Sequence, residues 1–415
     1  MNPAFGPAQI RALTEIFVAK SIALRDVWAA QIDQETSTAR VDVLSWLSRM
    51  TLDVIGHAGF NYQFDALVGK PNELNEAFSH IFHAGGSFWS LPVLLKLFFP
   101  PLRFIPEQDV SFRRAQATMS RIGRDLLKQS KEAAKSEKPG DRDLLSLLIK
   151  SNMSVDVPAN QRMSDDDVLA QVPTFLAAGH ETTRSLLINR AFLVSSTSTT
   201  WALYLLSTNP GSQSKLRDEV TSAPSDAPSM DELNALPYLD SVVREVLRSL
   251  APIPNTGRIA MQDDVIPLGQ PFVDKYGREH HELRVTKGQE LVIPIMGMNK
   301  DKTLWGPDAY EFKPERWGNL PEAVSSIPGV WGNMMTFHGG SHACIGWRFA
   351  LVEMKALLFT LIRAYSFELA VPKEDVLIKR AFPVIRPVVR NTEGKVGEGK
   401  VNELHGLPML IRPVS

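Results

Sequence analysis

The chain has 415 residues, and its 45 lysine and arginine side chains are nearly balanced by 46 aspartate and glutamate side chains, for a net charge of -1. That balance gives no electrostatic reason to expect a nucleic-acid partner. Hydrophobic residues make up 44% and charged residues 22%, as in ordinary soluble proteins, which argues against a disordered chain and against a membrane bundle. A single cysteine excludes an internal disulfide, and with it a disulfide-stapled secreted scaffold.

The N-terminal residues lack the basic, apolar and small-residue order of a signal peptide. The most apolar stretch, SLPVLLKLFFPPLRFI (90–105), is interrupted by Lys96 and by prolines within less than the roughly 20 residues of a membrane span. FWSLPVLLKLFF (88–99) could still touch a bilayer surface, and a buried helix explains the same pattern.

Helical periodicity dominates the first part of the chain. DLLSLLIKS (143–151) and SVVREVLRSL (241–250) have apolar residues at three- and four-residue spacing, which predicts helices with one buried face. In LRVTKGQELVIPI (283–295), β-type residues on both sides of Lys287-Gly288 predict a hairpin. TSAPSDAPSMDEL (221–233) and RNTEGKVGEGK (390–400) are predicted to be surface loops. We therefore expect a mainly α fold with small β-sheets, formed by residues 1–415 as one domain.

SDDDVLAQVPTFLAAGHETT (164–183) begins as a good helix, because Ser164 and the acids after it satisfy free amides and the helix dipole. Its second half contains Pro173, Gly179 and a threonine pair, which form helix poorly. Two interpretations stay open here: a ligand lies against a distorted helix, or Gly179 caps a helix C-terminus.

Two charged patterns are unremarkable by themselves. EVLR (245–248) has Glu245 and Arg248 at i, i+3 spacing, and taken alone it predicts an exposed ion pair contributing less than about 1 kcal/mol. In FKPERW (312–317), Arg316 follows a proline that disfavours helix at Lys313.

The only cysteine lies in FHGGSHACIG (337–346), where glycines permit unusual turns and leave room near the sulfur. WRFALVEMKALLFTLI (347–362) follows with helical periodicity, so Cys344 precedes a helix N-terminus whose amides favour a thiolate. A metal site using this one thiolate needs other ligands, and a porphyrin provides four. The alternative is a buried structural cysteine.

Together these segments resemble the cytochrome P-450 family. Its haem-binding loop reads Phe, two residues, Gly, one residue, usually Arg, one residue, Cys, one residue, Gly; this chain matches at Phe337, Gly340, Cys344 and Gly346, with His342 at the arginine position. AGHETT (178–183) is similar to the family's oxygen-activating helix, EVLR to its Glu-x-x-Arg helix, and PERW (314–317) to the segment with the second arginine. The overall pattern is most similar to fungal membrane-bound members.

The resemblance implies a haem b cofactor with Cys344 as the axial ligand of the iron. It implies that Phe337 packs beside the sulfur and that Arg258 and His342 face the haem propionates. It places Gly340 and Gly346 in the cofactor-binding loop, and Ala178 and Gly179 where dioxygen needs space. Glu245, Arg248 and Arg316 would form a buried charge network that folds this region around the haem.

Thr182 is similar to the hydroxyl that takes part in dioxygen activation in the family, and Glu181 would relay protons to it. The implied reaction inserts one oxygen atom of dioxygen into an apolar substrate of small to medium size. Electrons would come from NADPH through an NADPH-cytochrome reductase. The complete protein would sit on the cytosolic face of the endoplasmic reticulum membrane.

Two departures from the family lead to further expectations. The chain starts where the family has already passed its Trp-x-x-x-Arg helix, so we expect a P-450 fold lacking its N-terminal part. RSLLINRAFLVS (184–195) separates ETT from a segment that normally follows it directly. We interpret both as gene-model errors, a missed exon and a retained intron; a real truncation is the other interpretation. The alternative to an active enzyme is an inactive product that binds a hydrophobic ligand without turnover.

Overall fold

A computed structural model describes residues 2–74, 76–77, 110–135, 143–153, 162–169, 194–381, 384–390 and 403–414. Across these ranges no helix combines the length and apolar character needed to cross a membrane. The segment 88–99, for which a bilayer contact was considered, lies outside them.

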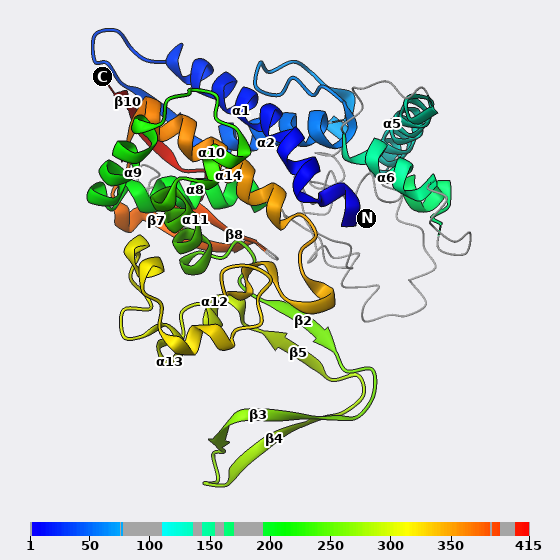
Figure 1. Ribbon diagram of the computed structural model, residues 1–415, viewed down its shortest axis with the longest axis vertical. Helices are drawn as coiled ribbons and strands as arrows, with labels where there is room; N and C mark the ends of the chain where they lie inside the picture. Colours follow the sequence, from blue (N-terminus) through cyan, green and yellow to red (C-terminus); the bar gives the residue numbers. More distant parts are fainter. Residues whose placement is uncertain are drawn as a thin grey trace.

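Helices make up most of the described chain, as predicted, and Figure 1 shows α1, α8, α9, α10 and α11 near α14, with α5 and α6 on one side of this group. The predicted helices at 143–151, 241–250 and 347–362 are confirmed as α6, α11 and α14. The helices are α1 (Pro7–Ala29), α2 (Val43–Phe60), α5 (Val110–Lys135), α6 (Leu144–Met153), α8 (Val194–Ser207), α9 (Pro210–Ser222), α10 (Met230–Asn234), α11 (Pro237–Ser249), α12 (Ile295–Met298), α13 (Lys302–Trp305) and α14 (Trp347–Ala364).

The buried core is built on α14, which packs against α1, α8, α9 and α11. Its sequence explains this position, because nearly every residue from Phe349 to Ile362 is buried, including side chains on all its faces. A helix that is apolar all round belongs in the interior. From α1, Phe17 meets Phe349 edge to face with ring centroids 4.6 Å apart.

The strands form small antiparallel sheets, as the fold prediction expects. In the sheet β1–β10–β6, the C-terminal strand lies between an early strand and the strand that follows α14, so the two ends of the described chain are joined. The strands are β1 (Ala39–Asp42), β2 (Thr256–Ile259), β3 (Asp264–Val273), β4 (Glu279–Val285), β5 (Glu290–Ile293), β6 (Tyr365–Leu369), β7 (Val376–Ala381), β8 (Val384–Arg390), β9 (Glu403–His405) and β10 (Pro408–Pro413).

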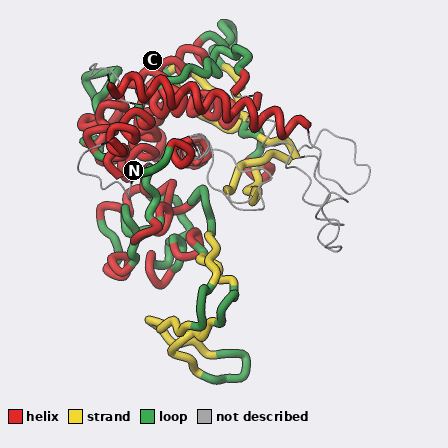
Figure 2. The backbone as a smooth tube through the Cα atoms, turned by 90° about the vertical axis from the view of Figure 1, so that its right-hand side faces the viewer, coloured by secondary structure: helices red, strands yellow, loops and turns green. Residues whose placement is uncertain are grey.

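The hairpin predicted around Lys287-Gly288 is wrong. β4 pairs with β3, and β5 pairs with β2, so the strands that flank Gly288 have different partners. Gly288 does make a turn with φ of 85°, but its N–H donates to the carbonyl of Ala260 and extends the β2–β5 ladder. The true hairpin turn is at Asp274–Gly277, and the arm β3–β4 projects from the body in both Figure 1 and Figure 2.

The predicted surface loop at 221–233 is correct only in its middle, 223–229, because its first two residues belong to α9 and its last four to α10. Ser229 caps α10 with a reciprocal pair of hydrogen bonds to Glu232, and Met230 and Leu233 are buried. The Ser229-x-x-Glu232 pattern was a helix-start signal that the turn-rich residues before it obscured. Of the other predicted loop, 390–400, only Arg390 lies within the described residues, at the end of β8.

Candidate functional site

Cys344 lies between a short 3-10 helix, η7 (Gly340–His342), and the first residue of α14. Its backbone N–H donates to the carbonyl of Phe337, the last residue of the 3-10 helix η6 (Met335–Phe337), at 2.8 Å. Phe337 is buried and its ring meets that of Trp331 with centroids 5.9 Å apart. The segment therefore forms a closed loop whose two ends are fixed by Phe337 and by α14.

Glycine is required in this loop for two different reasons. Gly340 has a φ of 63°, a left-handed conformation that other residues adopt at a cost. A Cβ on Gly339 would stand 1.8 Å from the carbonyl oxygen of Pro328, which no real contact allows. Gly346 is different, because a Cβ there would meet its nearest atom only at 3.9 Å, on Phe5. The space beside Gly346 thus agrees with the prediction that the backbone is kept clear two residues after the cysteine.

The Cys344 side chain is only partly exposed, and burial raises its pKa above the ordinary thiol value, although the N–H of Gly346 acts in the opposite direction. The predicted effect of the helix amides is present, because the Gly346 N–H favours the thiolate, but burial outweighs it. The loss of solvation destabilises the thiolate more than the hydrogen bond from one amide stabilises it. A metal ion bound to the sulfur would favour the thiolate against this burial.

Basic side chains lie beside the loop, and Arg258 is the permanently charged one among them. The pKa of His338 is lowered by its burial, and then by the charges of Arg258 on β2 and of His342 on η7. Arg258 and His342 therefore both lie near His338 and favour its neutral form. The guanidinium of Arg258 and the imidazole N–H groups are hydrogen-bond donors, so the donor set fits a ligand with negatively charged groups.

Glu245 and Arg248, both on α11, form a bidentate ion pair in which Nε donates to Oε2 at 2.9 Å and Nη2 donates to Oε1 at 2.8 Å. Neither side chain is exposed. Arg316, on the 3-10 helix η4 (Pro314–Gly318), donates from Nε to Oε1 of Glu245 at 3.3 Å. The three charged residues named from the sequence are thus brought together, and the local interpretation of EVLR as an exposed pair is wrong.

Neighbouring groups complete the hydrogen bonding of this network. The indole of Trp317 and the backbone N–H of Lys313 donate to Glu245 at 3.1 and 2.9 Å. Arg316 also donates from Nη1 to Oδ1 of Asp308 at 2.6 Å, and this bond, with one from Lys313, lowers the pKa of Asp308 to about 2. A buried charge is tolerated only when its bonding capacity is filled in this way.

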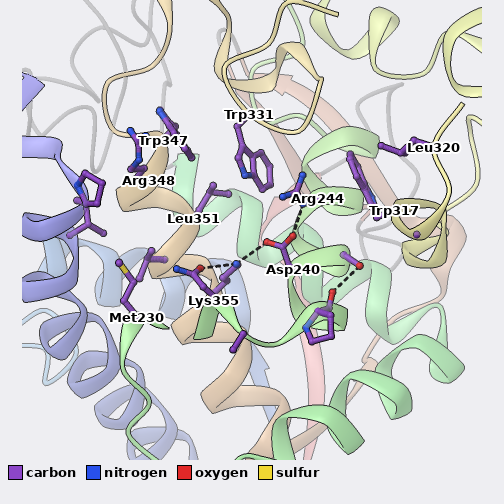
Figure 3. A pocket seen from close by; sticks show the side chains of 18 residues that line it. Met230, Asp240, Arg244, Trp317, Leu320, Trp331, Trp347, Arg348, Leu351 and Lys355 are labelled. Carbon is purple, nitrogen blue, oxygen red and sulfur yellow. Dashed lines mark hydrogen bonds and ion pairs between the residues drawn. The ribbon is translucent and has the colours of Figure 1, made fainter. Parts of the chain in front are cut away.

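A cavity of about 820 Å³ adjoins the cysteine loop and is shown in Figure 3. Trp347 and Arg348 line it from the start of α14, and Trp331 lines it from the segment before η6. In its wall, Asp240 accepts from Arg244 at 2.5 Å and pairs with Lys355 at 2.8 Å. Burial alone would raise the pKa of Asp240, but these two cations outweigh it and the pKa is lowered.

Several predicted site residues lie outside the described residues. These are Ala178, Gly179, Glu181 and Thr182. The start of the same segment is described: residues 165–169 are helical, and the N–H of Asp167 donates to the hydroxyl of Ser164 at 3.1 Å. Of the predicted insert 184–195, Val194 and Ser195 already belong to α8.

Sequence reasoning missed His338, Asp308 and Trp317. Trp317 directly follows Arg316 in FKPERW, and Asp308 lies eight residues before Arg316 in WGPDA (305–309). Their closeness to Arg316 in the sequence could have indicated that they belong to the same charge network. His338 offered none, because only the folded loop, with a φ of 58° at this residue, brings it to Arg258.

Comparison with known proteins gives a consistent result. The model of the family described as Cytochrome P450 matches residues 1–390. Cytochrome P450 monooxygenase 205 of Postia placenta is 52% identical over 424 aligned positions, which cover 100% of this chain and 74% of that protein. Monooxygenase 128 of the same organism is 53% identical over 409 positions (94% and 72%). Cytochrome P450 monooxygenase claO of Ampulloclitocybe clavipes is 36% identical over 411 positions (95% and 72%).

Proposed function

Since this chain belongs to the cytochrome P450 family and its relatives are monooxygenases, we propose that Cys344 ligates a haem iron and that the chain oxygenates an apolar substrate. One observation carries the proposal: the only cysteine lies in a loop that is closed by the Phe337 carbonyl, has space beside Gly346 and lies near the basic side chains of Arg258, His338 and His342. When bound, haem supplies the chemistry of dioxygen activation. The fold is that of the family, mainly α with small sheets.

The residues that would hold the haem are those of the loop and of the facing strand. Cys344 would supply the thiolate, and the positive charge of the iron would favour the thiolate against the burial that raises the thiol pKa. Phe337 and the backbone of Gly340 and Gly346 would pack beside the sulfur. Arg258 and His342 would bind the propionates, whose negative charge suits the Arg258 guanidinium and the imidazole N–H donors.

We propose that Thr182 and Glu181 move protons at the oxygen-binding face, with Ala178 and Gly179 leaving room there. A hydroxyl beside a carboxylate can pass a proton inward from solvent while the carboxylate is reprotonated. The buried network of Glu245, Arg248 and Arg316 has a positioning role in the same proposal. It holds α11 and η4 so that the cysteine loop keeps its shape.

The electron source we propose is NADPH, through an NADPH-cytochrome reductase. We further propose that the protein works on the cytosolic face of the endoplasmic reticulum membrane and that residues 1–415 act as one domain. The family implies dioxygen and an apolar substrate. The naming of the relatives as monooxygenases favours this function over an inactive product that binds a ligand without turnover.

The test is reconstitution of the haem-loaded chain with a reductase, NADPH, isotopically labelled dioxygen and a panel of apolar substrates. The proposal expects product with one labelled oxygen atom per molecule, dependent on both NADPH and the reductase, and lost in Thr182→Ala and Cys344→Ser. Product carrying oxygen from water, or formed equally well without the reductase, contradicts it.

A further inference from the structure

Two parts of the site that are distant in the sequence meet at one buried amide. The charge network lies on α11, and the cysteine loop begins at η6. Between them lies Asn299, the C-cap residue of α12, whose side chain has no exposed surface. Its hydrogen bonds connect it to both α11 and η6.

The Asn299 side chain binds the loop. Its Oδ1 accepts from the backbone N–H of Met335 at 3.1 Å, and its Nδ2 donates to Oγ1 of Thr336 at 2.8 Å. Because the Met335 N–H can only donate, the two ends of the amide have a defined orientation. Met335 and Thr336 are the first two residues of η6, and Phe337 is the third.

The same residue is bound to α11 by two routes. Nη1 of Arg248 donates to the Asn299 carbonyl at 2.9 Å. The Thr336 hydroxyl, having accepted from Asn299, donates to the carbonyl of Leu247 at 2.8 Å. That carbonyl is in the last turn of α11, where no intrahelical donor is available. Leu247 and Arg248 are neighbours in the chain, so Asn299, Thr336 and the end of α11 form a closed ring of hydrogen bonds.

We propose that Asn299 is a positioning residue that sets the cysteine loop against α11 and so fixes where the Cys344 sulfur lies. The ring holds Thr336, the next residue is Phe337, and the Phe337 carbonyl accepts from the Cys344 N–H. The effect of Asn299 on haem ligation rests on the proposed function. The effect of Asn299 on the position of the loop is independent of that function, so it can be tested without haem.

The first experiment measures the rate at which iodoacetamide alkylates Cys344 in the full chain purified without added haem, since this thiol is the only one present. Asn299→Leu, of similar size, removes both bonds to the loop and leaves the Met335 N–H and the Thr336 hydroxyl short of a partner. Such a loss favours the opened loop about tenfold, so alkylation is expected to accelerate by about that factor. Thr336→Val should act in the same direction, and Thr336→Ser, which keeps the hydroxyl, should restore the slow rate.

The matched control is Gln213→Met. Gln213 is also a buried amide, and it bonds Leu206, Phe367 and Arg217, all outside the cysteine loop. Its loss should lower the unfolding midpoint as Asn299→Leu does while leaving the alkylation rate unchanged. Equal acceleration in both variants, or no acceleration in Asn299→Leu, overturns the proposal.

A second readout uses the haem-loaded protein and separates this inference from the proposed function. In the carbon monoxide difference spectrum of the reduced protein, Asn299→Leu should convert part of the red-shifted thiolate-type band to the band of a protonated or displaced thiol, and Gln213→Met should not. A wild-type protein without the thiolate-type band would contradict the proposed function, whereas the alkylation result would still decide the role of Asn299.

Discussion

Arg248 donates two hydrogen bonds to the carboxylate of Glu245, at 2.9 and 2.8 Å, and neither side chain has any exposed surface. The guanidinium also lies over the ring of Trp305, 5.1 Å from its centroid. The pair is therefore enclosed by residues that come 50 or more positions later in the chain, including Arg316, which is 71 residues from Glu245. Its environment depends on tertiary packing.

Arg248→Met is expected to destabilise the protein by about 3 to 5 kcal/mol, because it leaves the buried Glu245 carboxylate without its main partner. Urea unfolding of both proteins measures this difference. The control is Arg284→Met, which breaks an ion pair with Glu282 in which the arginine side chain is 82% exposed, and should cost less than about 1 kcal/mol. A similar loss of unfolding free energy in the two variants would show that the Glu245–Arg248 pair contributes no more than an exposed ion pair.

Glu353 on α14 makes stability depend on pH. Its side chain is buried, and Oε2 has no hydrogen-bond partner among the residues that the structure describes. Burial raises its pKa from 4.5 to about 8, against a smaller opposite effect of the Ser195 hydroxyl. A proton is thus held more tightly in the folded than in the unfolded chain. The stabilisation is fully present below pH 4.5 and is lost as the pH rises toward 8, by up to about 1.4 kcal/mol per pH unit.

Glu353→Gln should remove this slope, because the amide has no proton to lose in that range. Denaturation curves collected from pH 5 to 9 check the prediction, with the exposed Glu368→Gln as the control that keeps the wild-type slope. A slope that survives in Glu353→Gln would assign the pH dependence to another group.

Gly339→Ala should prevent the cysteine loop from closing, since the added methyl would fall 1.8 Å from the Pro328 carbonyl. We expect loss of haem retention on gel filtration and a lower unfolding temperature. Gly211→Ala, in α9 with nothing within 4 Å of the new methyl, should be neutral or stabilising by up to about 1 kcal/mol. Normal haem retention in Gly339→Ala would contradict the claim that the close approach to Pro328 requires glycine at this position.

Transcript sequencing tests the interpretation of residues 184–195 as a retained intron. The expected transcript joins the Thr183 codon to that of Ser196. This junction would place Thr183 where Ser195 now stands in α8, so a hydroxyl would remain beside Glu353. Reads that run through 184–195 without a break would overturn the interpretation.

What could be predicted from the sequence was local. The cysteine loop was recognisable because glycine spacing, a single cysteine and a following apolar helix all lie within one short segment. The capped start at Ser164 was recognisable for the same reason, since the hydroxyl and the acids that bond to it are neighbours.

The features that could not be predicted depend on residues that are distant in the sequence and pack against the segment only in the folded chain. The spacing in EVLR is the same whether the Glu245–Arg248 pair is exposed or buried. The pair is buried because η4 and the residues before it pack against it. The strands beside Gly288 matched a hairpin, yet each pairs with a strand outside that segment because the β3–β4 arm is inserted within the β2–β5 pair. Asn299 carries no motif, and its importance comes from the ring of bonds that folding closes.

The most direct test of the central claim is the carbon monoxide difference spectrum of the dithionite-reduced, haem-loaded chain, recorded beside Cys344→Ser and beside a variant without 184–195. The account predicts a strongly red-shifted Soret band that depends on Cys344, in this chain or after the deletion. A spectrum with no such band in either protein, or a band that persists in Cys344→Ser, would contradict the assignment of Cys344 as the iron ligand.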